Sequence, residues 1–112
     1  MSKFFVLYLA PVSAIEQMMA SATPEQMKAG MHAWMTWMKS NAEVLTDMGA
    51  PLGKTKRITA AGVSNTKNEV TGYSIVEAES HEAAAAMFVG HPHLHMPGAY
   101  IDVVAVMPVP GM

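Results

Sequence analysis

The residues best suited to chemistry lie close together, in the segment from His91 to Met96. Histidines occupy its first, third and fifth positions. The ordinary pKa of imidazole lies close to neutrality, so each is a candidate proton donor or acceptor. Three imidazoles and a thioether are also a donor set that transition metals accept, but Pro92 and Pro97 restrict the loop and no carboxylate adjoins it. We therefore favour acid–base use of His91 or His93 over a metal site.

An aspartate lies in the apolar run that follows, AYIDVVAVM at residues 99–107. This run predicts a strand, and alternation puts Asp102 on the same face as Tyr100. A buried aspartate beside His91 or His93 would form an acid–base pair in which the histidine titrates near neutral pH. The catalytic candidates are therefore His91, His93 and Asp102. The competing interpretation is an aspartate that is hydrogen-bonded to backbone or to a partner subunit.

Three tyrosines are candidate ligand-binding residues: Tyr8, Tyr73 and Tyr100. Each combines an aromatic ring with a polar tip on a predicted strand, which suits a pocket wall. The alternative for each is a core tyrosine with a satisfied hydroxyl. His32, by contrast, falls at the centre of the polar face of a predicted helix, and we expect it to be exposed and inert.

Composition limits the classes of function. The 112 residues are 51% hydrophobic and contain no cysteine, which fits one domain over residues 1–112 and excludes thiol chemistry and disulfides. The net charge of −2 and a single basic cluster at residues 54–57 argue against nucleic-acid binding. No apolar run approaches the roughly 18 residues of a membrane span. With no such span and no cysteine, we expect a cytoplasmic protein. Nucleotide-binding glycine motifs are absent from the sequence, so we expect no cofactor.

The longest predicted element is one amphipathic helix from Thr23 to Gly49. Thr23 and Gln26 form a capping box around Pro24, and Gly49 with Pro51 supplies the stop. One face carries a bulky apolar stripe, which predicts packing against a sheet. Its members are Met27, Met31, Trp34, Met35, Met38, Ala42 and Leu45.

The remaining patterns predict a β-α-β-β-α-β order. A short helix follows a capping box at Ser13, a polar loop spans 64–68, and Ser80 caps a helix that ends at Gly90. The predicted strands are residues 3–10, 55–62, 69–79 and 99–107. This order is that of a ferredoxin-like α+β fold, with both helices on one face of a four-stranded antiparallel sheet. The other face would be too apolar for water, which predicts a homodimer with facing sheets.

The sequence resembles the YCII-related domain family and its DGPF-type relatives over nearly its whole length. The segments that carry the resemblance are FFVLYLAP, AWMTWM, LTDMGAPL, TGYSIVEAES, GHP and GAYIDVV. It implies a dimeric α+β barrel. A better-known branch of the family has a histidine in the first helix and an aspartate in an Asp-Pro step. In this sequence the histidine position matches Trp37 or Met38, and the Asp-Pro position matches His91-Pro92. We therefore do not assign the family's His–Asp pair to this chain. Tyr100 and Asp102 match the family pattern directly.

Three functions stay open at this point. The first is a small cofactor-free enzyme that uses His91 or His93 with Asp102 and a tyrosine for proton transfer on a small organic molecule. The second is a binding module or sensor for a small apolar molecule, lined by methionines and aromatic residues. The third is a dimerisation domain without chemistry. A structure in which the histidines reach Asp102 in a closed pocket favours the enzyme, and a purely apolar pocket favours the binder.

Overall fold

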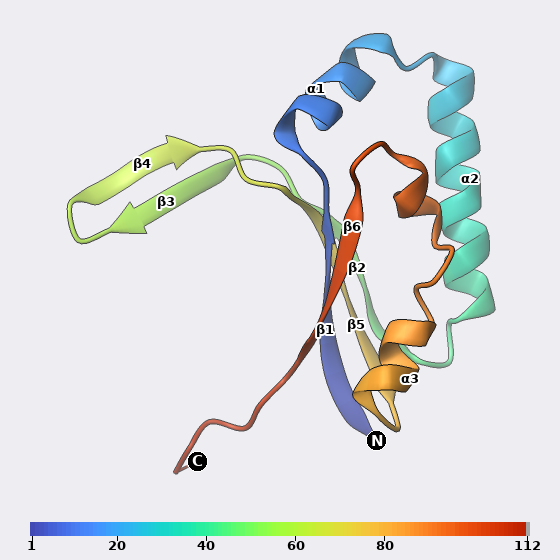
Figure 1. Ribbon diagram of the computed structural model, residues 1–112, viewed down its shortest axis with the longest axis vertical. Helices are drawn as coiled ribbons and strands as arrows, with labels where there is room; N and C mark the ends of the chain where they lie inside the picture. Colours follow the sequence, from blue (N-terminus) through green and yellow to red (C-terminus); the bar gives the residue numbers. More distant parts are fainter. Residues whose placement is uncertain (112) are drawn as a thin grey trace.

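The computed structural model describes residues 1–111 (Figure 1). The elements along the chain are β1 (Ser2–Leu9), α1 (Val12–Ser21), α2 (Pro24–Ser40), β2 (Leu45–Pro51), β3 (Thr55–Thr59), β4 (Gly62–Thr66), β5 (Val70–Ala78), α3 (His81–Ala86), the 3-10 helix η1 (Pro92–His95) and β6 (Tyr100–Ala105). No helix within these residues is long and apolar enough to cross a membrane.

Four strands form an antiparallel sheet in the order β2-β5-β1-β6. Helices α1 and α2 connect β1 to β2, and α3 with η1 connects β5 to β6. All of these helices lie on one side of the sheet (Figure 1). The predicted ferredoxin-like fold is therefore confirmed, with an additional hairpin between β2 and β5.

The two faces of the sheet differ in burial. On the helix side, Phe4, Val6 and Tyr8 of β1 are buried together with Val76 of β5. Alternation turns the next residues the other way, as the sequence predicted. That second side, here called the open face, is formed by Phe5, Leu7, Tyr73, Ile75, Asp102 and Val104, which are neighbours in the strand register.

The long helix begins as predicted and ends early. Thr23 caps α2, its hydroxyl accepting from the Gln26 amide at 3.2 Å while the Gln26 side chain accepts from the Thr23 amide at 3.0 Å. The helix stops at Ser40, where the Asn41 side chain donates to the Trp37 carbonyl at 2.9 Å. The predicted extension to Gly49 is wrong, because the residues after this turn pair with β5 as an edge strand.

The segment predicted as the second core strand forms a separate hairpin instead. Strands β3 and β4 pair only with each other, and the predicted loop at residues 64–68 begins inside β4. We call residues 55–66 the arm. The arm stands away from the body of the molecule (Figure 1). Core strand β2 was missed because its pattern continues the apolar stripe of the helix before it.

The other helix ends were predicted in part. The Ser80 hydroxyl accepts from the Ala83 amide at 3.0 Å, which confirms the cap of α3. This helix stops at Ala86, before the predicted end. At α1 the expected capping box is wrong, since Pro11 rather than Ser13 is the N-cap and no side chain caps the helix.

Candidate functional site

A cleft of about 650 Å³ opens between helices α1 and α2 and the sheet. Helix α2 stands off the sheet far enough that none of its residues is buried. Its apolar stripe therefore faces the cleft as well as the core. The sequence had predicted only that this stripe packs against the sheet. Seven of the twelve methionines line the space. The principal lining residues are Tyr8, Met18, Met19, Met27, Gly30, Met31, Trp34, Met35, Met38, Met48 and Thr71.

Tyr8 is the polar group at the floor of the cleft. Its hydroxyl lies 2.9 Å from the hydroxyl of Ser74, which itself donates to the Met48 carbonyl at 2.9 Å. Since a serine has one hydroxyl proton, the tyrosine is the donor in the first bond. The lone pairs on the Tyr8 oxygen remain as acceptors. Burial raises the pKa of this phenol, so it stays protonated around neutral pH.

Two histidines are buried behind this floor. His93 Nε2 lies 2.7 Å from the Leu9 carbonyl, and a carbonyl only accepts, so that nitrogen carries the proton. The Nδ1 atom of neutral His93 is then the bare acceptor. The His93 ring meets Tyr8 edge-on, with centroids 5.6 Å apart. One of the predicted histidines therefore lies directly against the predicted tyrosine.

His91 is completely buried among aromatic rings. Its Nδ1 accepts from the His93 amide at 3.0 Å, which leaves the proton on Nε2. That nitrogen has no hydrogen-bond partner among the described residues. Trp34 and Trp37 both pack edge-on at 4.5 Å from the imidazole centroid. Burial first, and then the charges of His93 and His95, lower the pKa of His91 to about 4.

The chain geometry explains why only two of the three loop histidines point inward. Gly90 adopts a φ of +77°, and Pro92 starts the single 3-10 turn that follows. This turn buries His91 and His93 but leaves His95 exposed. The three imidazoles do not converge, and within residues 1–111 no group of three histidine or acidic side chains is placed to hold a metal ion.

The structure does not bring Asp102 to these histidines. Asp102 pairs with Leu7 in the strand register and shares the open face with it, whereas Tyr8 faces the helices. The predicted histidine–aspartate contact is therefore wrong, because the alternation of β6 turns Ile101 and Val103 toward the helices instead.

The other two predicted tyrosines direct their hydroxyls away from Tyr8, although Tyr73 also belongs to the lining of the cleft. The Tyr73 ring stacks on Phe5 of the open face, and its hydroxyl donates to Asp47 at 3.4 Å. The Tyr100 hydroxyl donates to Glu69, which raises the pKa of that phenol. Of the three candidate ligand-binding tyrosines, Tyr8 is the one that joins the histidines.

Sequence reasoning missed the part that the two tryptophans play. Trp34 was predicted as a member of the apolar stripe and Trp37 was not, yet both contact His91. One signal was available. The YCII-related resemblance aligned its helix histidine with Trp37 or Met38 and its aspartate with His91, and Trp37 and His91 do lie in contact.

No family model and no curated protein matches this sequence. A similar solved structure is that of 5-chloro-2-hydroxyhydroquinone dehydrochlorinase (TftG) from Burkholderia phenoliruptrix AC1100, in complex with 2,5-dihydroxybenzoquinone. The two structures align with a TM-score of 0.57 over 97% of this chain and 95% of that one, at 12% sequence identity. This likeness shows a shared fold and agrees with the ferredoxin-like architecture described above.

Proposed function

We propose that this protein binds a small, uncharged aromatic molecule in the cleft between α1, α2 and the sheet. The observation that carries the proposal is the cleft itself. Its volume of about 650 Å³ is in the range of small-molecule sites. None of the described residues that line it is charged, so it offers no counter-ion to a carboxylate or phosphate. Methionines adapt their shape to a ligand, and Trp34 and Tyr8 add aromatic surface.

The structural neighbour supports the size and flat shape of the ligand. TftG holds a dihydroxybenzoquinone, a small flat ring that carries oxygen atoms. A ring of this kind would fit between the methionines of α2 and the floor at Tyr8. The lone pairs of the Tyr8 hydroxyl would then favour a ligand that presents an O–H or N–H group to the floor.

Gly30 offers a direct test of the cleft. A Cβ atom at this position meets nothing within 4 Å, and the residue lines the cleft from α2. We expect Gly30→Leu to fill the cleft and to weaken binding of the neutral fluorescent probe N-phenyl-1-naphthylamine roughly tenfold or more. Fluorescence titration measures this. Ala29→Leu adds the same side chain on an exposed part of the same helix and should bind like the natural chain. Equal binding by Gly30→Leu would contradict the proposal.

A second candidate function is proton transfer on the bound molecule. The bare Nδ1 of His93 favours it, because this buried imidazole lies directly against Tyr8 at the floor of the cleft and could act as a base. In this version His93 removes a proton from a ligand carbon or oxygen, and His91 keeps the His93 backbone in place. Asp102 belongs to the other face and takes no part. Exchange of the ring protons of resorcinol, a small aromatic ring that is neutral at pH 7, can be followed by NMR in heavy water, and it should be accelerated by the natural chain and not by His93→Gln.

We also propose that the protein is a homodimer whose open faces pack together. The open face is mainly apolar and only half-covered, with Val104 45% exposed. The resemblance to the YCII-related family implies the same arrangement, a dimeric α+β barrel. Packing two such faces would remove Phe5, Leu7 and Ile75 from water, which is the usual driving force of association.

A single charge on the open face should prevent this association. Val104→Glu adds two further carboxylates to the proposed interface, one from each copy, beside those of Asp102. We expect a monomer by sedimentation equilibrium at concentrations where the natural chain is a dimer. Val89→Glu introduces the same group at a residue that is 82% exposed after α3, and it should leave the dimer intact. A dimeric Val104→Glu variant would place the interface elsewhere.

A further inference from the structure

Charge is distributed unevenly between the arm and the rest of the chain. Residues 54–67, the arm with its two flanking lysines, hold four of the seven basic residues and no acidic one. The remainder has three basic residues against nine acidic ones. The basic residues of the arm region are Lys54, Lys56, Arg57 and Lys67. The positive charge of this protein is therefore concentrated on the one element that leaves its body.

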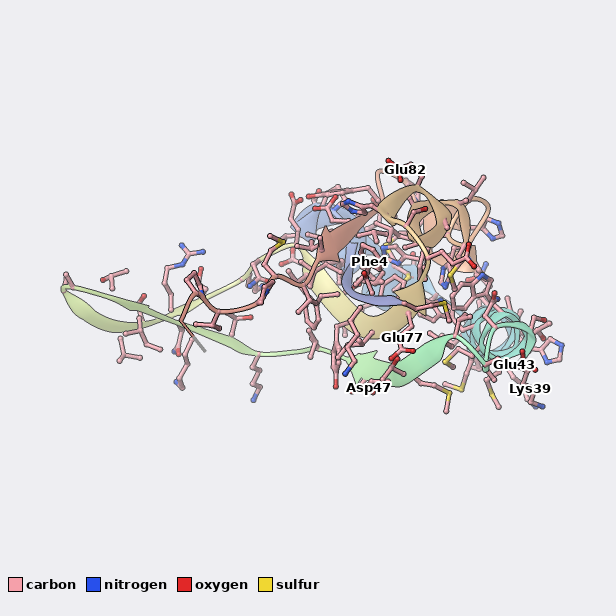
Figure 2. The ribbon with its side chains drawn as sticks, turned by 90° about the horizontal axis from the view of Figure 1, so that it is seen from below. Phe4, Lys39, Glu43, Asp47, Glu77 and Glu82 are labelled. Atoms are coloured by element: carbon pink, nitrogen blue, oxygen red, sulfur yellow. The ribbon has the colours of Figure 1, made fainter. Side chains whose placement is uncertain are left out.

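The arm pairs with no other strand among residues 1–111, and its apolar side chains are exposed. Ile58 and Val63 face each other across the hairpin, and they are 77% and 67% exposed. An isolated two-stranded ribbon is marginally stable in water. Both views show the arm projecting on the side of the sheet away from α2, which is the side of the open face (Figures 1 and 2). A subunit docked on the open face would thus lie next to the arm.

The open face provides the complementary charge. Asp47 pairs with Ile75 and Glu77 lies two residues further along β5, so both carboxylates belong to this side, as does Asp102. Lys3, the register partner of Glu77, also lies on this side, so the acidic groups exceed the basic one. Figure 2 shows Asp47 and Glu77 close together beside β2. The same chain therefore carries a basic apolar arm and an apolar face with acidic groups.

We propose that in the homodimer each arm clasps the second copy of the chain. The pair Ile58 and Val63 would pack on the flank of the partner, while Lys56, which strand alternation puts on the same side of the arm, lies against acidic groups of its sheet. This inference rests on the proposed homodimer and adds a second contact to it. Nucleic acid is the other partner that a basic arm suggests, but the acidic remainder of the chain repels phosphates and attracts the arm of another copy.

The test removes the arm and leaves the sheet untouched. Thr55 and Thr66 are paired neighbours, so two glycines in place of residues 55–66 close the chain with little strain. We expect dimerisation of this variant to be at least roughly tenfold weaker than that of the full chain, by sedimentation equilibrium at low salt. Circular dichroism and thermal unfolding check that the four-stranded sheet is retained.

A charge variant keeps the test independent of the deletion. Lys54→Glu with Lys56→Glu should weaken the dimer to a similar degree, and added salt should reduce the difference from the natural chain. Lys28→Glu with Lys39→Glu on exposed positions of α2 gives the same change in net charge and should leave the dimer unchanged.

The outcomes separate this proposal from the one it rests on. A full chain that is monomeric would overturn both the homodimer and the clasp. A dimer of unchanged affinity in the armless and charge-reversed variants would overturn the clasp alone. The clasp alone would also be overturned if the full chain bound a random DNA duplex through the arm and these substitutions left its self-association unchanged.

Discussion

The substitution Gly49→Ala is expected to remove a large part of the stability of the protein. A Cβ atom on this residue would lie 1.6 Å from the carbonyl oxygen of Tyr73 and 2.5 Å from its carbonyl carbon. These are backbone atoms of a central strand, which cannot rotate away as a side chain would. The φ of +77° adds backbone strain, because alanine adopts this conformation only at a steric cost that glycine lacks. Together these effects predict a loss on the order of 4 kcal/mol or more of unfolding free energy, a large fraction of the roughly 5–15 kcal/mol that is usual for a domain.

Urea denaturation monitored by circular dichroism measures this loss. Gly30→Ala is the matched control, since a methyl group there meets nothing and lies within a helix. Removal of a helical glycine should raise the unfolding free energy by up to about 1 kcal/mol. A Gly49→Ala variant as stable as the natural chain would mean that β2 is not held against β5 in this register.

Gly49 also shows how far local sequence signals reach. A glycine followed by a proline two residues later is typical of a helix end, and the sequence predicted one there. In the structure the same residue lies at an irregularity of the β2–β5 pairing. The start of α2 was predicted correctly because its capping box involves only Thr23 and Gln26. The end was not, because pairing with a strand more than twenty residues away decides it.

The site could be predicted in residue type but not in arrangement. His91, His93 and Tyr8 were candidates because imidazole and phenol carry chemistry wherever they occur. Asp102 was grouped with them by nearness in sequence, and the strand register then placed it on the opposite face. The contact of Trp34 with His91 joins residues more than fifty positions apart, and no local pattern encodes it.

Acidification is expected to destabilise the protein through His91. The pKa of this histidine is lowered from 6.5 to about 4 by burial and by the charges of His93 and His95. As the pH falls, His91 is therefore protonated in the unfolded chain at a pH where it is still neutral in the folded protein. The contribution of His91 to stability is complete above pH 6.5 and falls as the pH drops toward 4, by about 3 kcal/mol in total.

His91→Asn isolates this effect from the titration of every other group. The asparagine oxygen takes the place of Nδ1 and accepts from the His93 amide, but it does not titrate. Urea denaturation at about pH 7.5 and about pH 4.5 should show a smaller loss for the variant, by roughly 2 to 3 kcal/mol. Parallel losses in the two proteins would mean that His91 is not buried as a neutral base.

Intrinsic fluorescence gives a second measurement of the same event. The chain contains two tryptophans, Trp34 and Trp37, and both pack on His91. A proton on this imidazole places a positive charge between two indoles. The tryptophan emission should therefore change with pH, with a midpoint near the pKa of His91 in the folded protein, and this change should be absent in His91→Asn.

Trp34 also lines the cleft, so a ligand bound there should shift the same emission. A charge behind the floor would make the cleft less suited to an apolar ring, and binding of N-phenyl-1-naphthylamine should therefore weaken as His91 becomes protonated.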